Sequence, residues 1–199
     1  MQQEIYETII VGGGIAGIGC LRSLGSRDTL LLTQDVGGRI SVSRDRCVNY
    51  GAYYVRKDYT HILSFVYLKR RIFPNDLLFE TNKRLWRAHS LFIHHPVLMF
   101  RFLKKLKQFD KHYQQFKKAS EHVSQKIALS HDPFLTDIFQ KDAKTYLHEQ
   151  NLTSCISLFL DSIIKSSAFI DVENHDVSAG FMFQLSLILL YPIYLPRIE

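Results

Sequence analysis

The residues best suited to chemistry in this 199-residue chain are glycines near its start, spaced as Gly12-x-Gly14-x-x-Gly17. Residues 5–11, directly before them, are mostly apolar or β-branched, which predicts a buried parallel strand. Gly12 permits a tight turn, Gly14 lets backbone approach a pyrophosphate, and Gly17 lets the next helix pack close to the strand. The spacing therefore predicts that backbone N–H groups at the positive end of a helix bind the phosphates of a dinucleotide.

The elements that must position this turn follow in the order strand, helix, strand. We expect a helix from Ile15 to Leu24, with Gly25 as its C-terminal stop. The apolar run Thr29-Leu-Leu-Leu-Thr33 is the second expected strand. In this context the glycine spacing indicates a Rossmann-type site. The alternative is a tight turn that holds no ligand.

The end of the second strand departs from the usual pattern. Sites for NAD or FAD place an acid there, where it bonds a ribose hydroxyl. In this chain Gln34 takes that place and Asp35 follows it. Gln34 could bond a ribose through its amide, or Asp35 could reach the ribose across a tight turn. The strand end carries no Arg or Lys to bind a 2′-phosphate, which disfavours NADP.

A second glycine pair, Gly37-Gly38, follows and is succeeded by Arg39. Two glycines allow backbone conformations that are closed to other residues and leave N–H groups uncovered. The guanidinium of an arginine offers phosphate a rigid fork of donors. The alternative is a turn with a solvated Arg39, but the preceding fingerprint favours the phosphate role.

With these motifs and the segment Asn49-Tyr-Gly-Ala-Tyr-Tyr54, the chain resembles the flavin amine oxidase superfamily, which includes amine oxidases, protoporphyrinogen oxidases and phytoene desaturases. The resemblance implies FAD as cofactor, with Arg39 neutralising pyrophosphate charge and with Gly51 and Ala52 beside the isoalloxazine ring. It implies an oxidoreductase that oxidises a C–N or C–C bond by hydride transfer to the flavin. Tyr54 is either a flavin-side or a packing residue. The residues expected at the cofactor are Gly12, Gly13, Gly14, Ile15, Ala16, Gly17, Gln34, Asp35, Gly37, Gly38, Arg39, Ile40, Gly51, Ala52 and Tyr53.

Members of that superfamily are considerably longer and close the flavin site with a C-terminal strand and helix. Gly180 is the only glycine after Gly51, so no second glycine-rich turn is present to do this. We therefore expect the N-terminal half of such an enzyme, as a truncated, split or degenerate form. A C-terminal half or a partner chain would complete the site, and we name no catalytic side chain.

The remaining sequence predicts a folded, mainly helical region. From Tyr59 onward the periodicity is helical, with one helix over 95–118 and another from Asp132-Pro133 to about residue 150. A further helix is expected to begin at Thr153 or Ser154. Phe181 to Leu195 is apolar but shorter than the about 20 residues of a spanning helix. We expect a buried element there whose covering partner is missing, which would leave apolar surface exposed.

The predicted fold class is α/β. Residues 1–58 are expected to form the N-terminal part of a Rossmann-type FAD/NAD(P)-binding domain. Residues 59–175 are expected to form a helical substrate or cap domain, and residues 176–199 an apolar C-terminal segment.

Charge is concentrated in one region. Residues 69–118 hold thirteen Lys or Arg against Asp76, Glu80 and Asp110, whereas the whole chain carries a net charge of +6. Such a basic, aromatic-rich segment indicates either the solvated face of a cap domain or contact with a membrane surface. No nucleic-acid module accompanies it, so we expect no nucleic-acid partner.

The cysteines Cys20, Cys47 and Cys155 show neither disulfide nor metal spacing, which is typical of a reducing compartment. Cys20 is expected to serve packing. The N-terminus lacks a signal-peptide pattern, so we expect a cytoplasmic protein, with a peripheral membrane location as the alternative. Two further functional hypotheses stay open: a non-catalytic nucleotide-binding protein and a peripheral membrane-interaction protein.

Overall fold

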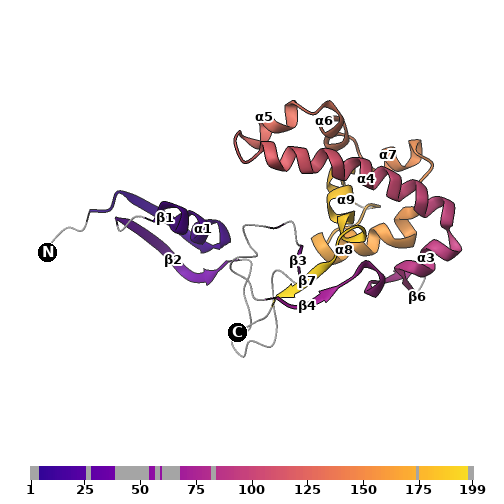
Figure 1. Ribbon diagram of the computed structural model, residues 1–199, viewed down its shortest axis with the longest axis horizontal. Coiled ribbons are helices and arrows are strands. Elements are labelled where there is room, and N and C mark those ends of the chain that lie inside the picture. Colours follow the sequence, from indigo (N-terminus) through magenta and orange to yellow (C-terminus); the bar gives the residue numbers. More distant parts are fainter. Residues whose placement is uncertain are drawn as a thin grey trace. The chain divides into compact units, whose positions relative to one another are not determined.

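The computed structural model describes residues 5–25, 28–38, 54–56, 59, 68–81, 84–173 and 175–196. Within them the chain is mixed α/β, mainly helical with small sheets, which confirms the predicted class at this level. The chain divides into two compact units. The first comprises Met1–Arg71 with Tyr194–Glu199, and the second comprises Ile72–Ile193. Figure 1 shows the elements of both.

The first unit begins with the expected strand, helix and strand. β1 (Thr8–Gly14) leads into α1 (Ile15–Leu24), and β2 (Thr29–Gly37) pairs with β1 in parallel (Figure 1). Gly25 ends α1 in the left-handed conformation, and its N–H bonds the Leu21 carbonyl at 3.3 Å. Both strands extend beyond their predicted ends, through the glycines that follow them.

The expectation that the first strand is buried is wrong for most of its side chains. Ile10 is the buried apolar residue of β1, whereas Ile9 and Val11 are 56% and 83% exposed. On β2, Leu32 and Val36 are also exposed. Parallel sheets are buried when helices cover both faces. Among the described residues, α1 is the helix that packs on this pair of strands.

A small sheet of three strands also contributes to the first unit. β3 (Val55–Arg56), β7 (Ile193–Pro196) and β4 (Leu68–Ile72) pair in the order β3-β7-β4. Val55 and Arg56 are buried, and the Arg56 guanidinium lies 5.3 Å from the centre of the Tyr59 ring. The end of the apolar C-terminal run is therefore a strand between two segments from the first half of the chain.

The second unit starts with a 3₁₀ turn, η1 (Pro74–Asp76), and an antiparallel hairpin of β5 (Leu78–Thr81) and β6 (Arg84–Arg87). These strands and β4 correct the prediction that the chain is helical from residue 59 onward. The reason is a period of two: Phe79 is buried and lies opposite Trp86, while Leu78 and Leu85 are exposed.

The rest of the second unit is helical. Helix α4 matches the helix predicted over 95–118. The stripe predicted from Asp132 to residue 150 is two helices, because the Asp142 carboxylate accepts a hydrogen bond from the Thr145 N–H at 2.8 Å and caps a new helix. The helical elements are α3 (Ala88–His94), α4 (Pro96–Ala119), α5 (Gln125–Ser130), α6 (Pro133–Gln140), α7 (Ala143–Glu149), η2 (Ile156–Leu160), α8 (Asp161–Ala168), α9 (Ala179–Ser186) and η3 (Leu187–Leu189).

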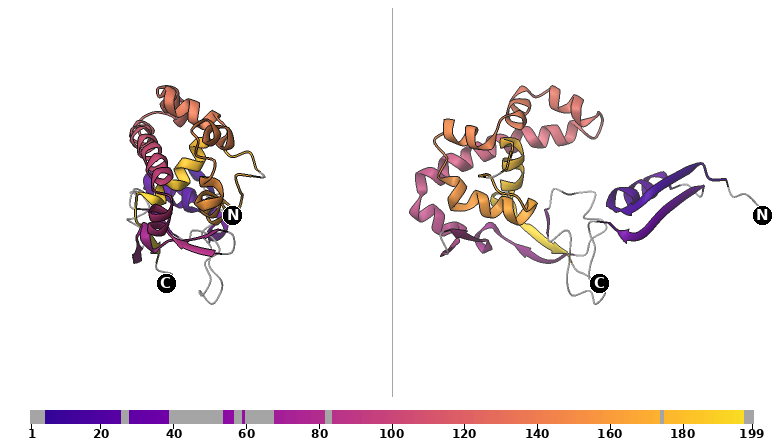
Figure 2. Two further views of the ribbon diagram at one scale, coloured as in Figure 1. Left: turned by 90° about the vertical axis from the view of Figure 1, so that its right-hand side faces the viewer. Right: turned by 180° about the vertical axis from the view of Figure 1, so that it is seen from behind.

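The core of the second unit is built around α9, which contacts α4, α6, α7 and α8. Figure 2 shows α9, in yellow, among these helices. Phe183 of α9 is fully buried, and its ring lies 5.8, 5.4 and 5.4 Å from those of Phe102, Phe109 and Tyr146. The expectation of uncovered apolar surface over Phe181 to Leu195 is therefore wrong here, because helices of the same chain cover α9 and η3.

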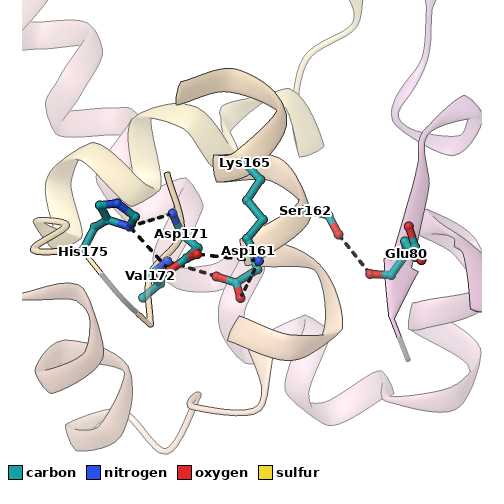
Figure 3. A network of polar contacts seen from close by, with 7 residues as sticks. All are labelled: Glu80, Asp161, Ser162, Lys165, Asp171, Val172 and His175. Atoms are coloured by element: carbon teal, nitrogen blue, oxygen red, sulfur yellow. Dashed lines mark hydrogen bonds and ion pairs between the residues drawn. The ribbon is translucent and has the colours of Figure 1, made fainter. Parts of the chain in front are cut away.

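Polar contacts fasten α8 to its surroundings (Figure 3). The Asp161 carboxylate accepts a hydrogen bond from the Val172 N–H at 3.1 Å, which holds the loop after α8. On the other side, the Ser162 hydroxyl donates to the Glu80 carbonyl of β5 at 3.1 Å. These bonds join the hairpin, the helix and the loop within one unit.

The approach of α6 to α9 generates the first prediction. A Cβ at Gly180 would lie 2.4–2.8 Å from three ring atoms of Phe139. We expect Gly180→Ala to lower the free energy of unfolding by about 1–3 kcal/mol. Phe139→Leu removes the ring. The double variant should therefore lose less free energy of unfolding than the sum of the losses in the two single variants. Urea denaturation of all four proteins checks this, and strict additivity would contradict the contact.

The capping aspartate of α6 generates a second prediction. Asp132 accepts a hydrogen bond from the Leu135 N–H at 3.0 Å, and its other oxygen lies 2.8 Å from His112 Nδ1. Burial opposes ionisation of this carboxyl, but the Leu135 N–H and the His112 imidazole outweigh burial and hold its pKa below the ordinary 3.8. A lowered pKa stabilises the fold above the unfolded-state value, and this contribution is lost as the pH falls through the folded-state value.

We therefore expect Asp132→Ala to cost about 1 kcal/mol at neutral pH and clearly less at pH 3. Urea denaturation at both pH values measures the difference. Asp142→Ala, which removes the aspartate cap of the neighbouring helix, is the comparison. An Asp132→Ala cost that does not change between the two pH values would contradict the assigned role of ionisation.

Candidate nucleotide-binding site

The turn between β1 and α1 leads into a helix whose N-terminus is not capped by a side chain. Gly12 adopts φ of 108°, a conformation that favours glycine. Gly14 is the N-cap of α1 and contributes no side-chain cap, and the first turn of the helix carries no acid. The first N–H groups of a helix have no intrahelical acceptor and lie at its positive end. This end of α1 is therefore suited to an anion.

The third glycine of the motif is where α1 contacts the turn. A Cβ at Gly17 would lie 1.9 Å from the Gly12 carbonyl oxygen and 3.4 Å from Ile10 Cγ2. The helix thus packs directly on the backbone of the turn, as predicted for Gly17. Any side chain at this position would push the N-terminus of α1 away from β1.

Strand β2 bulges beside the turn, which the sequence did not predict. Val11 pairs with Leu32, but Gly13 pairs with Val36, so three residues of β2 stand opposite one residue of β1. These three, Thr33, Gln34 and Asp35, are called the β2 bulge below. The bulge lies in β2, where this strand pairs in parallel with β1. It shifts the pairing of the two strands, so the residues after the bulge face different partners from those of a regular ladder.

Beyond the β2 bulge the two glycine motifs meet. Gly14 pairs with Gly37, and a Cβ at Gly38 would lie 3.0 Å from Gly14 Cα. The second motif therefore lies against the first, at the start of α1. The sequence suggested a common ligand for both motifs, and the structure shows that the described parts of the two are in direct contact.

Thr33 fastens the bulge to the turn. Its hydroxyl accepts a hydrogen bond from the Gly13 N–H at 2.9 Å and donates to the Asp35 carbonyl at 2.5 Å. The Asp35 carboxylate accepts from the Val36 N–H at 2.8 Å. The Gly13 N–H is thus already bonded within the protein. A phosphate at this turn would therefore accept hydrogen bonds from the N–H groups at the start of α1. This role of Thr33 was not predicted from the sequence. The sequence offered one indication of it, a hydroxyl group at the end of a predicted strand.

A groove of about 640 Å³ lies along these residues, and Asp35 is the one ionisable side chain among the described residues that line it. Of the residues expected at the cofactor, six line the groove: Gly12, Gly13, Gly14, Gln34, Asp35 and Gly38. Ile15, Ala16 and Gly17 form the first turn of α1, and Gly37 ends β2. Arg39, Ile40, Gly51, Ala52 and Tyr53 lie outside the described residues. Tyr54 is half-buried directly before β3.

The second unit contains a separate groove of about 440 Å³ between helices. Aromatic rings and two amides provide most of its wall, a lining typical of sites for small, largely apolar molecules. Its residues are Tyr113, Phe116, Gln125, Lys126, Leu129, Phe139 and Gln184.

The two described cysteines have opposite environments. Burial raises the pKa of the Cys155 thiol to about 12, so this thiol is not a nucleophile at neutral pH. Cys20 on α1 is exposed, which contradicts its expected packing role. The reason is that α1 buries none of its side chains within the described unit.

No family model, curated protein or solved structure matches this chain.

Within the described ranges, no helix combines the length and the apolar character needed to cross a membrane.

Two glycines of α1 provide a matched test of that geometry. Gly17→Ala places a methyl group 1.9 Å from a carbonyl oxygen, whereas a Cβ at Gly19 meets nothing within 4 Å. We expect Gly17→Ala to destabilise the β1–α1–β2 element by about 1–3 kcal/mol. Gly19→Ala should stabilise α1 by about 0.5–1 kcal/mol. Amide hydrogen exchange of residues 8–24 measures both effects, and equal protection in the two variants would contradict the packing described.

Proposed function

We propose that the β1–α1–β2 element binds the pyrophosphate of an adenine dinucleotide, and that this dinucleotide is FAD in preference to NAD. The observation that carries the proposal is the meeting of Gly14, Gly37 and Gly38 at the open N-terminus of α1. A pyrophosphate requires close backbone approach and the positive end of a helix, and both are present there.

The residues present fit the diphosphate. A Cβ at Gly12 would meet nothing within 4 Å, so the surface of the turn is free of packed side chains at that point. The N–H groups of Ile15 and Ala16, at the start of α1, would donate to the phosphate oxygens. Gln34 and Asp35, both exposed on the β2 bulge, are the candidates for the adenosine ribose.

The preference for FAD rests on the second motif. The described part of that motif, Gly37 and Gly38, lies against the first. Arg39 is the next residue and would neutralise pyrophosphate charge. The resemblance to the flavin amine oxidase superfamily rests on these same residues and points to the same cofactor.

We further propose the activity that the resemblance implies, the oxidation of a C–N or C–C bond. The flavin would supply the redox chemistry, and the protein would bind and orient it. The described lining of the groove offers one carboxylate, that of Asp35, which we assign to the adenosine ribose, so this lining would supply no acid or base at the flavin. Residues for that side would come from a C-terminal half of the site or from a partner chain.

A non-catalytic nucleotide-binding protein is the second candidate function. The groove favours it, because its described lining offers backbone groups and a single ionisable side chain. Anaerobic bleaching of bound FAD by a panel of amines and other hydride donors distinguishes the two. Reduction by any of these donors supports the oxidoreductase, whereas tight FAD binding without reduction by any of them supports the second candidate for this chain.

Gly14→Val tests the binding site itself. The Cβ at this position would lie 3.9 Å from its nearest neighbour, Gly38 Cα, and the backbone of Gly14 is extended, so the fold accommodates a Cβ here. Valine would occupy the space that a pyrophosphate needs. We expect affinity for FAD to fall at least about tenfold, equivalent to about 1.4 kcal/mol.

Quenching of flavin fluorescence measures this affinity, with ADP as a competitor that carries the adenosine and the diphosphate but not the flavin. Gly19→Ala is the control on the same helix and should bind FAD like the parent protein. If Gly14→Val binds FAD as tightly as the parent, the site is assigned to the wrong residues.

A further inference from the structure

The junction between α3 and α4 exposes an unusual amount of apolar surface. Phe92 and Ile93 on α3 are 40% and 72% exposed, and Val97 and Phe100 on α4 are each 70% exposed. All four lie within nine residues of chain. These four residues are called the apolar tip below. Clustered apolar exposure of this kind marks interaction surfaces, whereas single exposed apolar residues need no explanation.

The exposed side of α4 continues from the apolar tip as a row of cations. The spacing of three and four residues places Arg101, Lys104, Lys107, Lys111 and Lys118 on the side of Val97 and Phe100, and all are exposed. The opposite side of α4 is buried in the core of the second unit through Met99, Phe102, Leu106 and Phe109. Figure 1 shows α4 running along that unit.

No acid offsets these charges on α4. Its one acidic residue, Asp110, accepts a hydrogen bond from the Gln114 amide at 3.0 Å and another from the Tyr191 hydroxyl. Asp110 is therefore turned toward the body of the unit. Arg101 donates to the Gln150 carbonyl at 2.7 Å, which ties the start of this face to the end of α7.

We propose that the apolar tip and the cationic side of α4 form a docking surface for a membrane rich in anionic lipids. The apolar tip would enter the boundary between headgroups and acyl chains, and the lysines would contact lipid phosphates and carboxylates. This surface lies wholly in the second unit, so the inference does not depend on the nucleotide site.

Two other occupants fit the surface less well. A nucleic acid would satisfy the lysines but would leave Ile93, Val97 and Phe100 in water. A second copy of this chain, placed face to face by a twofold axis, would bring two rows of lysine together. An anionic bilayer satisfies both the charge and the apolar tip.

The test uses the full chain with phosphatidylcholine vesicles that contain about one third phosphatidylserine. Vesicle flotation measures the partition coefficient. Trp86, the single tryptophan, provides an independent signal, because its ring lies 5.1 Å from that of His94 at the end of α3. We expect binding to the anionic vesicles, weak binding to pure phosphatidylcholine, and a blue shift of Trp86 emission on binding.

Matched variants distinguish binding through this face of α4 from attraction by the overall positive charge of the protein. The double variant Lys104→Gln/Lys107→Gln should weaken vesicle binding about 25-fold, because each lysine contributes about fivefold. The control Lys126→Gln/Lys165→Gln removes the same charge from α5 and α8 and should change binding less than about twofold. Phe100→Ser should weaken binding about tenfold. Phe169→Ser removes a similarly exposed ring, 76% exposed, from the end of α8 and should leave binding unchanged.

Three results would overturn the proposal. One is the absence of binding to anionic vesicles at low salt. Another is equal loss of binding in the paired variants and their controls. The third is binding of an oligonucleotide, or self-association in sedimentation velocity, that Phe100→Ser abolishes while vesicle binding is unaffected.

Discussion

Both units depend on a place where two segments approach so closely that no Cβ can be accommodated. In the first unit a Cβ at Gly17 would lie 1.9 Å from the Gly12 carbonyl oxygen, and this contact holds the start of α1 against the turn. In the second unit Gly180 lies under the ring of Phe139, which lets α9 approach α6. Helix α9 then carries Phe183 into the centre of the aromatic core. A methyl group at Gly17 would meet backbone and must move the helix, whereas a methyl group at Gly180 would meet a closely packed ring that must shift.

The two units offer different chemistry to their surroundings. The first presents backbone N–H groups and, among the described residues that line its groove, a single ionisable side chain, which suits recognition of a diphosphate by a helix N-terminus. The second has a well-packed aromatic core and an exposed face that carries apolar and cationic side chains.

Local sequence signals predicted the parts of the fold that depend on neighbouring residues. The bounds of α1, its stop at Gly25 and the cap at Asp132 follow from such signals. The β2 bulge was not predictable, because it depends on a hydrogen bond between the Thr33 hydroxyl and the Gly13 N–H, twenty residues apart. The burial of α9 was predicted, but the helices that cover it were not, since they come from earlier parts of the chain. The hairpin of β5 and β6 was missed because a period of two over four residues is a short signal.

The most direct measurement of the central claim is the change in backbone amide chemical shifts of the ¹⁵N-labelled chain when ADP, and then FAD, is added. ADP carries the adenosine and the diphosphate without the flavin, so it tests the proposed contact at the glycine turn independently of the flavin. We expect the amides of Gly14, Ile15 and Ala16 to shift with both ligands and to saturate together with the fluorescence of bound FAD. Saturable FAD binding that leaves these three amides unshifted, with changes confined to other residues, would contradict the proposed site.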